Sequence, residues 1–183
     1  MSELQLYPVF DHWSENAWIN KEKYEDMYQE SVESPDSFWE KQAAEFLDWN
    51  VKWEQVYSAD FSKGHSSWFL GGKLNVTANC IDRHLDNRGD QTAIIWEGDD
   101  PSEHKKISYK ELHEHVSKMG NVLRQRNVKK GDRVCIYMPM IPEAAYAMLA
   151  CARIGAIHSV VFGGFSPEAL KDRILDSDCQ VII

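Results

Sequence analysis

The apolar run from Ala156 to Phe162 constrains the fold of this chain more than any other feature. It follows Gly155, a residue type that ends helices, and it precedes Gly163-Gly164 and the potential helix cap Ser166. A mostly apolar run of this kind predicts a strand covered on both faces, as in α/β proteins. Such proteins bind ligands where the carboxyl end of a strand meets the start of a helix. The sequence therefore predicts an α/β fold with a candidate ligand site at this glycine turn.

The sequence from Asn75 onward alternates between helix and strand patterns. Ser108 and Glu111 form a capping box ahead of an apolar stripe at helical spacing, and Asn75 can cap a helix that continues through Leu85. The strand patterns cover 92–96, 133–138, 156–162 and 180–183, and the further helix patterns cover 108–126, 142–154 and 166–176. Strands and helices at this spacing favour right-handed crossovers and a parallel sheet of three or four strands.

The segment before Asn75 has a different composition, because it holds six of the seven tryptophans. Helices are predicted over 19–33 and 36–48, the second with an apolar stripe formed by Trp39, Ala43, Phe46 and Leu47. Two or three helices of this length bury little surface by themselves, which favours an aromatic-rich extension anchored on another body. The alternative is an independent mini-domain with its own tryptophan core.

The net charge of −9, from 29 acidic and 20 basic residues, disfavours nucleic-acid and anionic-membrane partners. The first residues contain neither a basic region nor an apolar region of a secretion signal, and no run of apolar residues is long enough to span a membrane. The four cysteines are widely spaced and lack a CxxC pair, which predicts reduced, mostly buried thiols without a zinc site or disulfides. These features together predict a cytoplasmic protein.

From the residues alone, the glycine turn has two interpretations. Glycines let a ligand approach the backbone at the start of a helix, but two glycines between a strand and a helix are also ordinary turn geometry. Neither GxGxxG nor GxxxxGK[ST] occurs in the sequence, so no phosphate-binding motif decides between them. His158, inside the apolar run, is expected to be a hydrogen-bonded core imidazole, with a functional role as the alternative. Asp99-Asp100 is expected to lie in a turn rather than bind a metal.

Several blocks of the sequence, in one order, resemble the AMP-forming acetyl-coenzyme A synthetase family. They cover nearly the whole chain, at 35–39, 47–49, 68–75, 79–84, 88–90, 93–101, 137–144 and 148–166. The resemblance implies an acyl-adenylate-type fold, with a helical extension over 1–74 and the first βα units of a larger parallel-sheet domain over 75–183. It also places Phe162, Gly163 and Gly164 beside the nucleotide end of coenzyme A (CoA), as binding residues only. No catalytic residue and no metal ligand is expected in this chain.

The resemblance implies a two-step ligase. Acetate and ATP·Mg²⁺ form acetyl-AMP and pyrophosphate, and the CoA thiol then attacks the acetyl-AMP and releases AMP. Members of the family continue well beyond the equivalent of Ile183, and the residues that hold the ATP phosphates lie in that later part. The chain is therefore expected to be inactive alone and to have the rest of the ligase as its partner. The alternatives are a non-catalytic protein that binds CoA or a partner chain, and a fragment of a propionate or other short-chain ligase.

Overall fold

The computed structural model describes residues 7–183, which form two compact units. The first contains residues 7–47 and 53–72, and the second contains residues 48–52 and 73–183. Residues 1–6, which carry most of the expectation about a secretion signal, lie outside the described range. Within that range, none of the helices has both the length and the apolar character needed to cross a membrane.

The first unit begins with the helices α1 (Asp11–Ser14), α2 (Lys21–Glu33) and α3 (Pro35–Phe46). The Asn20 side chain caps α2 by accepting a hydrogen bond from the Lys23 amide at 2.8 Å. Both helices predicted from the sequence are confirmed, although each is shorter than expected. The stripe predicted on α3 is only partly correct, because Ala43 is buried whereas Trp39 and Phe46 are 43% and 58% exposed and Leu47 follows the helix. Phe38 is buried instead of Trp39, its neighbour in the sequence.

The first unit also contains an antiparallel hairpin that the helical interpretation of this segment missed. Its strands are β1 (Gln55–Asp60) and β2 (His65–Leu70), joined by a 3₁₀ turn, η1 (Phe61–Lys63). The Tyr57 and Trp68 rings face each other across the two strands, with their centroids 4.3 Å apart. Gly64 follows the turn with a φ of 64°, in the left-handed region that favours glycine. Asp60, Ser62 and Gly64 are therefore the turn residues that could have revealed the hairpin.

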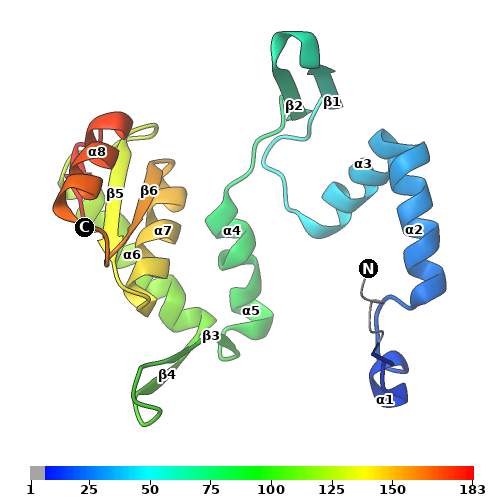
Figure 1. Cartoon of the computed structure of the whole chain (residues 1–183), viewed down its shortest axis with the longest axis horizontal. Helices are drawn as coiled ribbons and strands as arrows, with labels where there is room; N and C mark the ends of the chain where they lie inside the picture. Colours follow the sequence, from blue (N-terminus) through cyan, green and yellow to red (C-terminus); the bar gives the residue numbers. More distant parts are fainter. Residues whose placement is uncertain (1–6) are drawn as a thin grey trace, which may run out of the picture. The chain divides into compact units, whose positions relative to one another are not determined.

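In the second unit, the predicted parallel sheet is present with three strands in the order β6-β5-β7, an order that the sequence did not predict. Strands β5 and β6 lie side by side in Figure 1. The strands are β5 (Arg133–Met138), β6 (Ile157–Phe162) and β7 (Val181–Ile182). Residues Val134 to Ile136 of the central strand are fully buried. The expectation that the run of residues 156–162 is covered on both faces is wrong, because β6 is an edge strand in which only Val161 is buried.

Three longer helices flank this sheet, and their ends follow the predicted signals. They are α6 (Tyr109–Gln125), which starts with the complete Ser108–Glu111 capping box, α7 (Pro142–Ile154) and α8 (Pro167–Ser177). Gly155 ends α7 in the left-handed conformation, and the Ser166 hydroxyl accepts a hydrogen bond from the Ala169 amide. Helices α7 and α8 lie on opposite sides of the sheet (Figure 1), so β5 and β6 continue into helices on different faces. Ligands bind in α/β proteins at this kind of strand end.

The helix predicted from Asn75 through Leu85 is interrupted. Asn75 caps α4 (Val76–Cys80) through the amides of Thr77 and Ala78, as expected, but the helix ends before Ile81. A 3₁₀ turn, η2 (Asp82–His84), and the short α5 (Leu85–Arg88) follow. Ile81 is fully buried in the core with residues of α6 and α7, and this packing overrides the local helix pattern.

The predicted strand near residues 92–96 is confirmed as β3 (Thr92–Glu97). It pairs in antiparallel fashion with β4 (His104–Ser108), which the sequence interpretation did not include, and the pair stays separate from the parallel sheet. Only Ile107 of β4 is buried, so the strand carries little apolar pattern from which it could be predicted. The expected turn at Asp99-Asp100 is confirmed, since the Asp100 carboxylate accepts hydrogen bonds from the Ser102 amide and hydroxyl. These bonds lower the pKa of Asp100.

Candidate functional site

The predicted site residues lie together at the carboxyl end of β6. Phe162 is the last residue of the strand, Gly163 and Gly164 form the turn, and α8 begins after the Ser166 cap. The Phe165 amide donates a hydrogen bond to the Phe162 carbonyl oxygen at 3.0 Å and closes the turn. Residues 162–165 are all exposed. The structure therefore presents the backbone of this turn to solvent at the edge where an α/β sheet binds ligands.

Gly163 lies in close contact with the backbone of the neighbouring loop. A Cβ atom at this position would lie 3.2 Å from the carbonyl carbon of Met138 and 3.2 Å from the nitrogen of Pro139. Both are backbone atoms of the segment that follows β5, and they cannot rotate away as a side chain can. The turn around Gly163 therefore lies directly against the end of the central strand.

Gly164 has a different close contact, with a side chain. A Cβ atom here would lie 2.8 Å from Cε1 of the Phe162 ring, closer than real Cβ contacts allow. Neither Gly163 nor Gly164 has a positive φ, so close packing and not backbone conformation explains both glycines. This packing accounts for the Gly-Gly pair whether or not a ligand binds. Because both residues are glycines, no side chain covers the exposed backbone of the turn.

Two residues that the sequence interpretation did not single out, Tyr137 and Arg173, hold Phe165 at the end of the turn. The Tyr137 hydroxyl donates a hydrogen bond to the Phe165 carbonyl oxygen at 3.0 Å. The Arg173 guanidinium lies over the Phe165 ring, with its carbon 4.6 Å from the centroid. Tyr137 is 28 positions from Phe165, so no local pattern could have revealed the contact.

A mostly apolar cavity of about 450 Å³ lies beside the turn. Its lining includes Phe162 and Phe165 of the turn, Met138 and Met140 near the end of β5, and Met148 of α7. The Trp96 indole N–H donates a hydrogen bond to the Met140 carbonyl oxygen at 2.8 Å and thereby ties β3 to the same loop. An apolar hollow next to exposed backbone groups is the usual composition of a small-molecule site.

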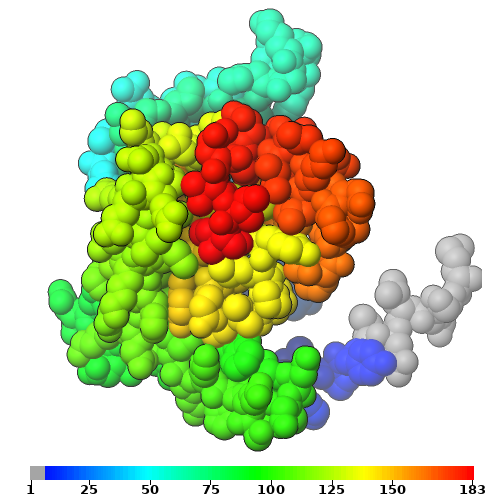
Figure 2. Space-filling model, turned by 90° about the vertical axis from the view of Figure 1, so that its left-hand side faces the viewer, coloured from blue at the N-terminus to red at the C-terminus, as the bar shows by residue number. Residues whose placement is uncertain are grey.

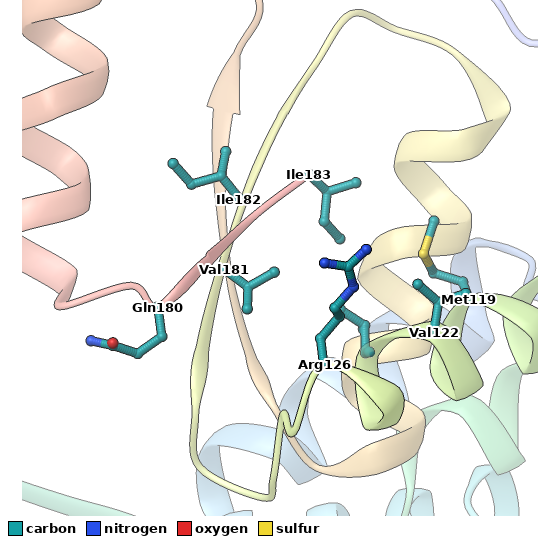
Figure 3. A pocket seen from close by; sticks show the side chains of 8 residues that line it. Met119, Val122, Arg126, Gln180, Val181, Ile182 and Ile183 are labelled. Atoms are coloured by element: carbon teal, nitrogen blue, oxygen red, sulfur yellow. The ribbon is translucent and has the colours of Figure 1, made fainter.

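A second hollow, of about 550 Å³, lies between α6 and β7, away from the glycine turn. Val181 and Ile183 point toward Met119 and Val122 of α6 and toward Arg126, which follows the helix, whereas Ile182 points away from them (Figure 3). The C-terminal residues that form one wall of this hollow lie at the surface of the unit (Figure 2). The lining of the hollow combines apolar side chains with Arg126 and Gln180, and no group in it points to a reaction.

Three histidines of the second unit lie away from the glycine turn, and His158 is not where the sequence predicted it. His158 was expected in the core, but it is exposed on the edge strand β6. His113 and His115 lie on α6, where the His115 ring stacks on Tyr146 at 4.7 Å and His113 Nε2 lies 3.8 Å from an Asp82 carboxylate oxygen. None of these imidazoles belongs to the glycine turn.

The cysteines are free thiols, of which Cys135 and Cys151 are buried, Cys179 is partly buried and Cys80 is exposed. Burial raises the pKa of Cys135, and it raises the pKa of Cys151 to about 11. We expect iodoacetamide at pH 8 to alkylate Cys80 at least about tenfold faster than Cys151, since thiolate and access are both needed for reaction. Peptide mass spectrometry under native conditions measures the two rates, with labelling in urea as the control. Equal native rates would contradict the buried position of Cys151.

Comparison with known proteins identifies the family. Residues 81–183 match the model of the AMP-binding enzyme, and residues 24–80 match the model of the acetyl-coenzyme A synthetase N-terminus. The chain belongs to the AMP-binding enzyme family, which confirms the acyl-adenylate type of fold expected from the sequence.

Within this family, the similarity to acetyl-coenzyme A synthetases is confirmed over the whole chain. It is 64% identical to the acetyl-coenzyme A synthetase of Saccharophagus degradans and 61% identical to that of Alkalilimnicola ehrlichii. It is 60% identical to acetyl-coenzyme A synthetase 2 of Pseudomonas aeruginosa. Each comparison covers 100% of this chain and 28% of the relative, so the chain spans little more than a quarter of their length.

Proposed function

We propose that the chain is the N-terminal part of an acetate–CoA ligase that forms acetyl-CoA, AMP and pyrophosphate from acetate, ATP and CoA through acetyl-AMP. The proposal divides the chain into an extension over 1–74 and the beginning of the adenylate-forming domain over 75–183. The observation that carries the proposal is the match of the whole chain, at 60% identity or more, to synthetases named for this activity.

Within the ligase, we assign Phe162, Gly163 and Gly164 to the binding of the CoA nucleotide. The exposed turn offers backbone atoms without side chains, and the start of α8 favours a phosphate group nearby. These residues bind and orient CoA, and none of them transfers a proton or breaks a bond. CoA supplies the thiol that attacks the acetyl group.

ATP and Mg²⁺ belong to the first step, in which acetate is adenylated. Among residues 7–183, no three His, Cys, Asp or Glu side chains are grouped as metal ligands, and we assign the ion no ligand in this chain. Transfer of the adenylyl group depends on positioned charge around the phosphates. We assign this charge to the part of the ligase that the chain does not include.

A hybrid ligase tests the proposed function. In the synthetase of Saccharophagus degradans, the part that this chain matches is replaced by residues 1–183, which are 64% identical to it. We expect the hybrid to catalyse acetate-dependent exchange of pyrophosphate into ATP, which reports the first step, and to form acetyl-CoA, which reports the second. Propionate in place of acetate tests the choice of acyl group.

The parent synthetase and the isolated chain serve as controls. The isolated chain is expected to release no AMP from acetate, ATP and CoA, because it lacks the residues assigned to the phosphates. A hybrid that matches the parent in circular dichroism and sedimentation but catalyses neither step would contradict the proposed function. Acetate- and CoA-dependent AMP release by the isolated chain would contradict the assignment of the first step to the rest of the ligase.

A further inference from the structure

We propose that Tyr137 and Arg173 are positioning residues of the CoA site, because they hold Phe165 and thereby fix the turn of residues 162–165. The inference rests on the proposed function, since it concerns the same turn. It adds two side chains to the site, and neither needs to touch CoA. They come from the elements on either side of the turn.

The first contact ties the turn to the sheet. Tyr137 lies on the central strand β5, and its hydroxyl reaches the Phe165 carbonyl oxygen at 3.0 Å. The amide of the same residue closes the turn on the Phe162 carbonyl oxygen, also at 3.0 Å. Both backbone polar groups of Phe165 therefore have partners, one inside the turn and one on the neighbouring strand.

The second contact holds the Phe165 side chain. The Arg173 guanidinium lies over the ring, and Nη1 of the same group donates a hydrogen bond to the Ala169 carbonyl oxygen at 3.0 Å. Helix α8 thus holds the guanidinium in a fixed place. On the turn itself, the Phe162 ring meets the Phe165 ring edge to face, with centroids 6.1 Å apart and an interplanar angle of 84°.

These contacts matter because the turn between them has little to restrain it. Gly163 and Gly164 are exposed and have no side chains, and glycine has the greatest backbone freedom of any residue. The loop after β5 blocks movement of Gly163 inward, since its backbone lies within 3.2 Å of the position of a Cβ atom. The turn can therefore move only outward, and the contacts of Phe165 limit this movement. A site that is ordered before the ligand arrives binds more tightly than one that must be ordered on binding.

The test uses Tyr137→Phe and Arg173→Ala in the hybrid ligase. The loss of the hydroxyl is expected to raise the KM for CoA by roughly three- to tenfold, the usual effect of one hydrogen bond. The loss of the guanidinium is expected to raise it by roughly two- to fivefold. The kcat at saturating CoA and the acetate-dependent pyrophosphate exchange stay unchanged. Arg173→Lys keeps the charge without the planar group and should give an intermediate KM.

Hydrogen exchange at the glycine turn separates positioning from a general loss of stability. In Tyr137→Phe, the amide of Phe165, which closes the turn on the Phe162 carbonyl oxygen, should exchange faster while those of β5 do not. Tyr109→Phe and Arg124→Ala are matched controls on α6, and both should leave the KM for CoA unchanged.

The inference is overturned if both variants keep the parent KM for CoA, or if they slow pyrophosphate exchange as much as acetyl-CoA formation. Loss of both steps in the unsubstituted hybrid would instead count against the proposed function. A lowered melting temperature with an unchanged KM would show that the two residues act only on stability, which also overturns the inference.

Discussion

In the hybrid ligase, Gly163→Val raises the KM for CoA by at least about tenfold and leaves acetate-dependent pyrophosphate exchange at the parent level. The expected size follows from the contact that any Cβ atom makes here, 3.2 Å from backbone atoms of both Met138 and Pro139. Because these atoms cannot rotate away, the turn must move outward, and a valine moves it further than an alanine. A displaced backbone costs more than the one hydrogen bond that corresponds to about a tenfold change.

The other glycines of the second unit provide a graded comparison. Gly164→Ala should have a smaller effect than Gly163→Ala, since the obstructing atom belongs to the Phe162 ring, a side chain that can turn. Gly120→Ala on α6 is the control, because its nearest contact would be an ordinary 3.5 Å from Ile154 and alanine favours a helix. Initial rates of both steps over a range of CoA concentrations measure all three variants.

Two outcomes would contradict the assignment of the turn to CoA. One is an unchanged KM for CoA in Gly163→Val, which would leave close packing as the only reason for the glycines. The other is a parallel loss of pyrophosphate exchange and acetyl-CoA formation, which would indicate a distorted domain. The two steps of one reaction therefore serve as internal controls for each other.

Local signals in the sequence predicted helix ends well. The Ser108–Glu111 capping box and the Asn75 and Ser166 caps act within three residues, and all of them are present in the structure. Gly155 likewise ends α7 in the left-handed conformation expected of a glycine. These interactions need no information from distant parts of the chain, so the sequence pattern is enough.

Features that depend on distant pairing were predicted less well. The place of β6 at the edge of the sheet follows from the strand order, and an apolar sequence does not reveal it. The break of the predicted helix at Ile81 likewise depends on packing against α6 and α7. In the same way, the glycine turn was found from the sequence, but its contacts with Tyr137 and Arg173 became visible only when the strands and helices were placed.

Leu123 of α6 belongs to the buried core of the second unit. Leu123 is 2% exposed and packs with Val134 of β5, whereas its neighbour Val122 is 50% exposed. Leu123→Ala is expected to lower the free energy of unfolding by about 2–5 kcal/mol, because it removes buried methyl groups and leaves a cavity. Val122→Ala, the matched control on the same helix, should stay within about 0.5 kcal/mol of the parent.

Urea unfolding of the 183-residue chain measures the free energy of unfolding of both variants. Hydrogen exchange at the β5 amides reports the stability of the second unit alone. A loss of several kcal/mol with Val122→Ala would mean that the hollow between α6 and β7, which Val122 lines (Figure 3), is closed in solution by packing of its own walls. If only Leu123→Ala lowers the free energy of unfolding by this amount, α6 is held to the sheet by its buried face.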